Sequence, residues 1–385
     1  MRDETKCLHA GYTPKNGEPR VVPIVQSTTY VYDSTDEVAS VFDEPTKSLI
    51  YSRFANPTVM AVEEKIAALE GGVGAMCTSS GQAASLLSIL NLCNAGDSFL
   101  ATAEIYGGTV NLFTHTLKKL GIECIYIEKG MTDEEIDALF KPNTKAVFGE
   151  TIANPALTVL DIERYANIAH RHGVPLIVDN TFATPVLCKP FDFGADIVIY
   201  STTKYMDGHA VQGGGIIVDS GKFDWTNGNF PDFTEPDVTY HGISYTETYG
   251  KAAYIIKARM QLMRDFGAYP AAHSAFLLNL GLETLALRME RYCENALKVA
   301  KYFEQSDKIE SVTYPGLESD ENHALAEKYL KGSSGVISIV IKGGRDNAVK
   351  FMDSLKLASN EVHVADIRTC VLHPASHTHR QMNEQ

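Results

Sequence analysis

Short apolar runs alternate with helix-period segments between residues 59 and 220 of this chain. Seven runs of three to five residues are present, at 75–77, 98–102, 124–127, 146–148, 176–178, 197–200 and 215–218. Short continuous apolar runs are typical of strands buried on both faces, and their alternation with helices is typical of parallel βαβ units. We therefore expect a doubly wound α/β domain with a mostly parallel sheet.

The chain has 385 residues, which is too long for one core and predicts several parts. Residues 1–58 carry five prolines and little helical period, which predicts an extended N-terminal arm that contacts a neighbouring subunit. Residues 59–250 are the expected α/β domain. Residues 251–385 have helical patterns first and then strand-like runs at 309–314, 335–341 and 369–372, with one helix near 346–355. This order predicts a smaller C-terminal α+β domain.

Charge and cysteine content narrow the class of protein. The formal net charge is -14 and the pI is about 5.3, which argues against nucleic acid or an anionic membrane as a partner. The seven cysteines are scattered and have no C-x-x-C spacing, so neither a disulfide framework nor a zinc site is predicted. The N-terminus is charged, and no apolar run approaches the roughly 18 residues of a membrane span. We expect a cytoplasmic enzyme that acts on a small molecule and holds no metal.

Lys204 lies just beyond the apolar run 197–200, after Ser201, Thr202 and Thr203. Ligands of open α/β sheets bind at the carboxyl ends of the strands. A partly desolvated amine there has a lowered proton affinity and can attack a carbonyl, which suggests a Schiff-base lysine. Judged by its own segment, however, this lysine more often simply reaches solvent from a strand end.

Asp179 ends a second apolar run, 25 residues before Lys204. A carboxylate at the same sheet edge could keep a pyridinium nitrogen protonated, which a pyridoxal phosphate ring needs to act as an electron sink. The alternative is that Asp179 only caps the following helix. The two charged strand ends together favour the cofactor interpretation.

The segment around Gly81 and Gln82 joins a strand to an alanine-rich helix. Free backbone N–H groups at such a helix start can bind a phosphate, although simple capping gives the same pattern. The hydroxyls of Ser201 and Thr203 would supply independent donors for the same anion. Agreement between the two segments favours a phosphate site.

Three further side chains fit the same site less securely. Tyr51 and Arg53 end the predicted arm, and a guanidinium suits bidentate phosphate contact, although a surface turn is the simpler interpretation. The arm could deliver both residues across a dimer interface. Tyr106 precedes two glycines and could lie on a cofactor ring, or could be an ordinary core tyrosine.

These pieces, in this order, resemble the Cys/Met-metabolism family of pyridoxal-phosphate enzymes of fold-type I. The resemblance spans nearly the whole chain and rests on these motifs: Tyr51-Ser-Arg-x-x-Asn-Pro-Thr, Ser80-Gly-x-Ala-Ala, Tyr106-Gly-Gly-Thr, Glu150-Thr-x-x-Asn-Pro, Asp179-Asn-Thr-Phe, Ser201-x-Thr-Lys-Tyr-x-x-Gly-His and His373-Pro-Ala-Ser-x-Thr-His. It implies an aspartate aminotransferase-like fold, with a large α/β domain and a smaller C-terminal domain.

The resemblance also implies roles for site residues. Lys204 would hold pyridoxal 5'-phosphate as a Schiff base and then shuttle protons, and Asp179 would bind the pyridine nitrogen. Asn154 would bond the ring hydroxyl, and Tyr106 would stack on the ring and assist proton transfer. The phosphate would be held by Gly81, Gln82, Ser201 and Thr203, and by Tyr51 and Arg53 of the adjacent subunit. This sharing implies an obligate dimer, usually paired into a tetramer.

Within the family, residues 229–242 and Gly108, where methionine γ-lyases carry a cysteine, resemble the O-acetylhomoserine sulfhydrylase branch. The implied reaction is γ-replacement of acetate on O-acetyl-L-homoserine by sulfide or methanethiol, giving homocysteine or methionine. A methionine γ-lyase, a cystathionine γ-lyase or a cystathionine γ-synthase would share the cofactor residues, and a non-catalytic binding protein is a rival of another class.

Family members usually continue past the His-Pro-Ala-Ser motif to an arginine that binds the substrate carboxylate. The C-terminal domain is therefore expected to be truncated, and the carboxylate-binding role stays unassigned. Arg368 fits a surface charge better. Residues 359–366 depart from the more common pattern with Gly before Asp, which places His363 and Ala365 at the expected substrate-side wall.

Overall fold

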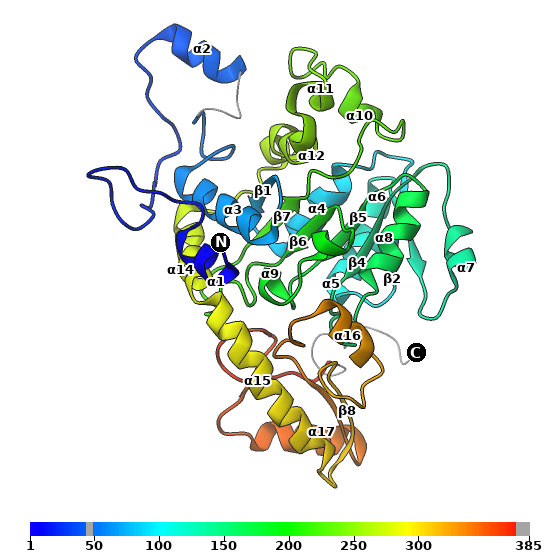
Figure 1. The fold of residues 1–385 in the computed structure, drawn as a ribbon. Helices are drawn as coiled ribbons and strands as arrows, with labels where there is room; N and C mark the ends of the chain where they lie inside the picture. The colour runs from blue at the N-terminus through cyan, green and yellow to red at the C-terminus, as the bar shows by residue number, and fades with distance from the viewer. Residues whose placement is uncertain (44–48, 375–385) are drawn as a thin grey trace.

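A computed structural model describes residues 1–43 and 49–374, and one twisted sheet of seven strands lies at its centre (Figure 1). The strands are β1 Gly74–Thr78, β2 Ser98–Thr102, β3 Glu123–Ile127, β4 Thr144–Glu150, β5 Leu176–Asp179, β6 Ile197–Tyr200 and β7 Gly215–Asp219. Their order is β1-β7-β6-β5-β4-β2-β3, and only β7 runs antiparallel to its neighbours. Each of the seven apolar runs is therefore a strand, and the mostly parallel α/β prediction is confirmed.

Helices connect these strands and pack on the sheet. Before and between the strands lie α3 Pro57–Glu70, α4 Gly81–Leu90, α5 Gly107–Asn111, η1 Leu112–Thr116, α6 Leu117–Lys119, α7 Asp133–Asp137, α8 Ile162–Arg171, α9 Thr184–Leu187 and η2 Pro190–Phe193. After β7 come α10 Pro231–Thr234, α11 Tyr245–Tyr249, η3 Gly250–Ala252, α12 Ala253–Lys257, η4 Ala258–Met263 and α13 Arg264–Phe266. Strands β2 and β6 are buried at every residue, so the core lies between the sheet and its helices.

The predicted glycine stop fixes the end of α3. Asn56 caps the start, because its side chain accepts a hydrogen bond from the Thr58 N–H at 3.0 Å, and Pro57 occupies the first helical position. Gly71 ends the helix in the left-handed conformation, with φ of 85°. These two ends deliver the chain directly into β1, whose carboxyl end faces the site described below.

The N-terminal segment differs from the extended arm that the prolines predict. It contains two helices, α1 Asp3–His9 and α2 Thr35–Asp43, joined by irregular chain. Both begin with acidic residues, which favour the positive end of the helix dipole, so a helix-start pattern was present in the sequence. Helix α1 packs on α3, whereas α2 stands away from the sheet (Figure 1).

The C-terminal part begins with α14 Ala272–Glu283 and the long α15 Leu285–Glu304, which leads away from the sheet (Figure 1). It contains the antiparallel pair β8 Ile309–Thr313 and β9 Ser338–Ile341, the parallel pair β10 Ser359–Asn360 and β11 Cys370–Val371, and helices α16 His323–Tyr329 and α17 Gly344–Ser354. The three predicted strands and the helix near 346–355 are confirmed, whereas α16 was not predicted. Among the described residues, no helix is both long and apolar enough to cross a membrane.

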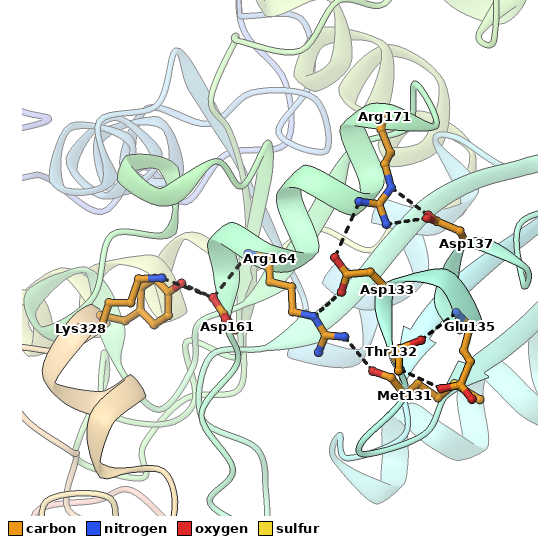
Figure 2. Close-up of polar contacts among 10 residues, drawn as sticks. Met131, Thr132, Asp133, Glu135, Asp137, Asp161, Arg164, Arg171 and Lys328 are labelled. Carbon is orange, nitrogen blue, oxygen red and sulfur yellow. Dashed lines mark hydrogen bonds and ion pairs between the residues drawn. The ribbon is translucent and has the colours of Figure 1, made fainter.

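Polar contacts hold α8 between α7 and α16 (Figure 2). Arg164 of α8 donates to the Asp133 carboxylate and to the Met131 carbonyl, both at 2.7 Å. Arg171, two turns later, forms a bidentate pair with Asp137 at 2.7 and 2.8 Å. At the other end of α8, Lys328 of α16 lies 3.6 Å from Asp161. The C-terminal part is thereby attached to the sheet domain close to the carboxyl end of β4.

Candidate active site

A cavity of about 300 Å³ opens at the carboxyl ends of β4, β5 and β6. The sheet domain lines it with Ser80, Gly81, Gln82, Ser85, Tyr106, Thr109, Glu150, Ile152, Asn154, Pro155, Asp179, Thr181, Phe182, Ser201, Thr203 and Lys204. Val362, Val364, Leu372 and Pro374 close it from the C-terminal part. The cavity therefore brings together eight of the ten residues predicted to bind the cofactor.

Lys204 lies in a turn that follows β6. Its backbone N–H donates to the Ser201 carbonyl at 3.3 Å, and its own carbonyl accepts from the Gly208 N–H at 2.8 Å. Burial lowers the pKa of the amine, because it disfavours the charged form. The Nζ atom lies 3.5 Å from Nδ1 of His363 in the C-terminal part. Lys204 is therefore a partly desolvated amine that faces a cavity, as the strand-end pattern predicts.

Asp179 ends β5, beside Lys204 in the lining of the cavity. Its Oδ1 accepts hydrogen bonds from the backbone N–H and the hydroxyl of Thr181, at 3.0 and 2.5 Å. Burial raises the pKa of Asp179 to about 6, and the two Thr181 bonds work against that rise. The carboxylate form therefore predominates at neutral pH and can pair with a cation in the cavity.

Glu150 also lines the cavity, although the sequence analysis gave it no role beyond its place in a motif. It ends β4, and its position is paired with Asp179 in the parallel register. Its two carboxyl oxygens accept from the backbone N–H groups of Tyr106 and Asn154. The pattern that exposed Asp179, a polar residue ending an apolar run, applies equally to Glu150 and could have found it.

Gly81 brings the start of α4 against the turn that carries Lys204. A Cβ on Gly81 would lie 2.6 Å from Cβ of Ser201, so no side chain fits there. Ser80 caps the helix by accepting from the Ala83 N–H at 3.1 Å. The N–H groups of the first turn of a helix have no partner inside the helix, so those of Gly81 and Gln82 can bind an anion.

The two predicted hydroxyl donors differ in their surroundings. Thr203 already exchanges hydrogen bonds with Gly214, since its hydroxyl donates to the carbonyl at 3.2 Å and accepts from the N–H at 3.0 Å. Ser201 instead presents its hydroxyl to the Gly81 turn. Ser201 is thus the more readily available donor for an anion.

Tyr106 stands at the start of α5 with its side chain 47% exposed, which leaves its ring accessible from the cavity. A Cβ on Gly108 would lie 2.5 Å from Cε1 of this ring and 2.6 Å from Nε2 of Gln82. The side-chain Oε1 of Gln82 is buried and has no hydrogen-bond partner among the described residues. Gly108 therefore allows the ring and this amide to approach each other.

Tyr51 and Arg53 are not among the residues that line this cavity. The guanidinium of Arg53 lies over the rings of Tyr51 and Phe54, 5.5 and 5.7 Å from their centroids. Its Nε is buried and has no hydrogen-bond partner in the described parts of the chain. Within one chain, these two residues are therefore separate from Lys204.

The predicted motif that begins at His373 is only partly described. His373 and Pro374 are placed, and Pro374 lines the cavity. The remainder of the motif, from residue 375, lies outside the described residues. Arg368 is exposed and pairs with Asp366 at 3.1 Å, in line with the surface role expected for it.

Residues 4–385 match the model of the Cys/Met metabolism PLP-dependent enzymes. The chain belongs to this family. It is 45% identical to an O-acetyl-L-homoserine sulfhydrylase of Corynebacterium glutamicum, over 99% of this chain and 89% of that protein. It is 46% identical to a homocysteine synthase of Schizosaccharomyces pombe, over 99% of this chain and 90% of that protein.

Solved structures of the family share the fold. A Campylobacter jejuni structure named as an O-acetylhomoserine (thiol)-lyase matches with a TM-score of 0.96 and 34% identity, over 100% of this chain and 92% of that one. It contains N'-pyridoxyl-lysine-5'-monophosphate. A structure of metB from Corynebacterium glutamicum matches with a TM-score of 0.84 and 32% identity, over 100% of this chain and 90% of that one.

The cavity fits pyridoxal phosphate, the cofactor of this family, in three separate ways. Gly81 has no side chain, so the hydroxyl of Ser201 and the free N–H groups at the start of α4 lie close together and can bind one anion. Asp179 offers a carboxylate to a pyridinium nitrogen, and Lys204 offers a buried amine to an aldehyde. A phosphate donor set, an acid and an amine around one cavity are what the cofactor requires.

Proposed function

We propose that this chain is an O-acetyl-L-homoserine sulfhydrylase. It replaces the γ-acetate of O-acetyl-L-homoserine by sulfide or methanethiol and gives homocysteine or methionine. The observation that carries the proposal is Lys204, an amine that burial leaves easier to deprotonate, in the lining of the cavity that Asp179 also lines. The chain around this pair is 42–46% identical to relatives named as sulfhydrylases or homocysteine synthases.

Bound pyridoxal phosphate supplies an electron sink for negative charge at the α-carbon of an amino acid. Lys204, Asp179 and Asn154 would hold its reactive end, with Tyr106 against the ring. Gly81, Gln82, Ser201 and Thr203 would hold its phosphate. Gln82 contributes through its backbone N–H, which depends on the helix start and not on the side chain.

Lys204 is the proton-transfer group of the reaction. Its amine has a lowered pKa because it is buried, so the neutral form that accepts a proton from the α-carbon is more accessible than in an exposed lysine. Asp179 is mostly charged above a pH of about 6, so it would pair with a protonated ring nitrogen of the bound cofactor. Tyr106 has its ring accessible from the cavity, where its hydroxyl can move a second proton as acetate leaves.

Gly108 supports the sulfhydrylase over a methionine γ-lyase, whose motif has cysteine at this position. Any side chain at residue 108 would meet the Tyr106 ring and the Gln82 amide. The arrangement of these two side chains therefore depends on the glycine. Of the solved structures compared above, the thiol-lyase also has the higher TM-score, 0.96 against 0.84 for metB.

We further propose a homo-oligomer built from dimers, in which Tyr51 and Arg53 reach the phosphate of a neighbouring subunit. Their separation from the cavity of their own chain supports this arrangement. A cytoplasmic location is supported by seven cysteines that form no disulfide, since all seven lie in the described residues.

The test is an assay of donors and acceptors with the purified holoenzyme. O-acetyl and O-succinyl homoserine are each combined with sulfide, methanethiol or cysteine. Sulfide-dependent homocysteine from the acetyl donor is expected. Rapid release of 2-oxobutanoate from methionine or cystathionine, without that homocysteine, would instead identify a lyase.

A second measurement separates an enzyme from a binding protein of the same fold. The wild type should show the visible absorbance of a lysine Schiff base, and Lys204→Ala should lose both this absorbance and the activity. A colourless wild type that takes up no added pyridoxal phosphate would reject the enzyme.

A further inference from the structure

We propose that Glu150 is a positioning residue that fixes Tyr106 and Asn154 beside Asp179, and that it does so as the protonated member of a buried carboxyl pair. The inference rests on the cofactor of the family and not on the identity of the amino-acid substrate. It therefore extends the proposed function without depending on the sulfhydrylase assignment.

The strand register places the two carboxyl groups side by side. Glu150 ends β4 and Asp179 ends β5, and these positions are partners in the parallel ladder. Partner residues of neighbouring strands send their side chains to the same face, and the strands lie about 4.8 Å apart. Both side chains line the cavity, and Glu150 is only 6% exposed.

Each oxygen of Glu150 accepts a hydrogen bond from a different segment. The Tyr106 N–H donates to Oε1 at 2.7 Å, at the start of α5. The Asn154 N–H donates to Oε2 at 3.2 Å, in the loop that follows β4. One side chain thus ties together the two segments that present the ring-stacking and the hydroxyl-binding residues.

The two neighbouring carboxyl groups, Glu150 and Asp179, are expected to share one proton. No ion pair joins either carboxyl to a lysine, arginine or histidine among the described residues, although Lys204 lines the same cavity. Two adjacent carboxylates repel each other, and Glu150 is the more buried of the two, so the neutral form is favoured at Glu150. Burial, followed by the charge of Asp179, raises the pKa of Glu150 well above its usual range, although the N–H bonds from Tyr106 and Asn154 work against that rise. The proton therefore belongs to Glu150, and Asp179 keeps its charge for the ring nitrogen.

The bond from the Tyr106 N–H is the shorter of the two, so Glu150 holds the start of α5 more closely than the loop that follows β4. Tyr106 is 47% exposed, so few other contacts hold it. Without Glu150, its backbone would lose the bond that fixes its position.

Two variants and one control test the proposal through the cofactor, without substrate. Glu150→Ala removes both ties and should weaken pyridoxal phosphate binding to the apoenzyme by about tenfold. Glu150→Gln keeps a neutral group and the bond from Tyr106 but cannot accept from Asn154, so a smaller loss is expected. Asp219→Asn is the matched control, because Asp219 is a buried carboxyl at the end of β7 that accepts from the Gly221 N–H at 2.8 Å. It should leave the cofactor affinity unchanged.

The pH dependence of the cofactor absorbance tests the protonation state. In Glu150→Gln the titration should keep its wild-type midpoint, because a neutral group replaces a neutral group. A shifted midpoint would mean that Glu150 is ionised, and wild-type affinity in both Glu150 variants would overturn its positioning role. If Glu150→Ala does not fold, the affinity and titration of Glu150→Gln decide. A protein that failed the sulfhydrylase assay could still pass this test.

Discussion

A single missing side chain shapes the anion-binding end of the cavity. Gly81 begins α4, and a Cβ there would lie within 3.0 Å of three atoms of Ser201. The close approach lets the first turn of a helix and a serine hydroxyl face the same anion. At the scale of one residue, phosphate binding depends on the absence of a methyl group.

Gly81→Ala should weaken cofactor binding by roughly tenfold to a hundredfold, because overpacking costs about 1–3 kcal/mol. Alanine favours helix more than glycine does, so the helix itself would not be weakened. Spectroscopic titration of the apoenzyme with pyridoxal phosphate measures the effect. Gly213→Ala is the control, since nothing lies within 4 Å of its Cβ. Equal affinity of the two variants would contradict the steric argument.

The buried side chain of Glu70 contacts Tyr200, at the end of the strand that leads to Lys204. The Tyr200 hydroxyl donates to the Glu70 carboxyl and accepts from the Asn180 amide at 2.9 Å. Burial raises the pKa of Glu70 from 4.5 to about 8. The folded protein therefore keeps a proton that the unfolded chain releases near pH 4.5. The stability that results is fully present below that pH and is lost as the pH rises through 8.

Glu70→Gln should flatten this part of the pH dependence, because its amide does not titrate. Thermal midpoints taken at one scan rate between pH 5 and pH 8 are the measurement. Between pH 5 and pH 8, the thermal midpoint of the wild type should fall further than that of the variant. Glu163→Gln, in an exposed pair with Lys328, provides a control that should follow the wild type. If the thermal midpoints of all three proteins fell equally with pH, the titrating group would not be Glu70.

At the scale of elements, the strands could be predicted because each contains a short run dominated by apolar residues. Lys204 and Asp179 could be predicted because strand ends of a parallel sheet converge. Glu150 follows the same strand-end pattern and could have been predicted to line the site, whereas its pairing with Asp179 depends on the register of β4 and β5, which the sequence does not show. Helix α16 is short and is held by contacts of Tyr329 with Phe193, Asp161 and Glu163, for which a local pattern gives little evidence.

Helix α7 is a short element whose cap should govern its local stability. The Thr132 hydroxyl accepts from the Glu135 N–H at 3.3 Å, and the Glu135 carboxylate accepts from the Thr132 N–H at 2.8 Å (Figure 2). Thr132→Ala should cost about 1 kcal/mol, which corresponds to about fivefold faster hydrogen exchange in α7. Thr226→Ala, in the exposed loop after β7, is the control. Unchanged hydrogen exchange in α7 would show that its ion pairs with Arg164 and Arg171, and not its cap, stabilise it.

At the scale of the whole molecule, the N-terminal segment leaves apolar side chains uncovered. Val21, Val31 and Tyr51 are 51, 96 and 37% exposed, and α2 stands away from the sheet (Figure 1). Apolar side chains gathered on one projecting segment are typical of a surface that another chain covers. The same segment carries Arg53, whose buried Nε has no partner in the described residues. These features favour a site completed by two subunits.

Subunit complementation tests that arrangement. Arg53→Ala and Lys204→Ala should each be inactive, or nearly so, when expressed alone. Co-expressed in equal amounts, they should recover about a quarter of the wild-type activity, because half of the dimers are mixed and each mixed dimer has one intact site. A mixture of the separately purified, non-exchanging proteins is the control and should stay inactive. If Arg53 served the cavity of its own chain, every site in the mixed dimers would lack one of the two residues, and co-expression would recover nothing.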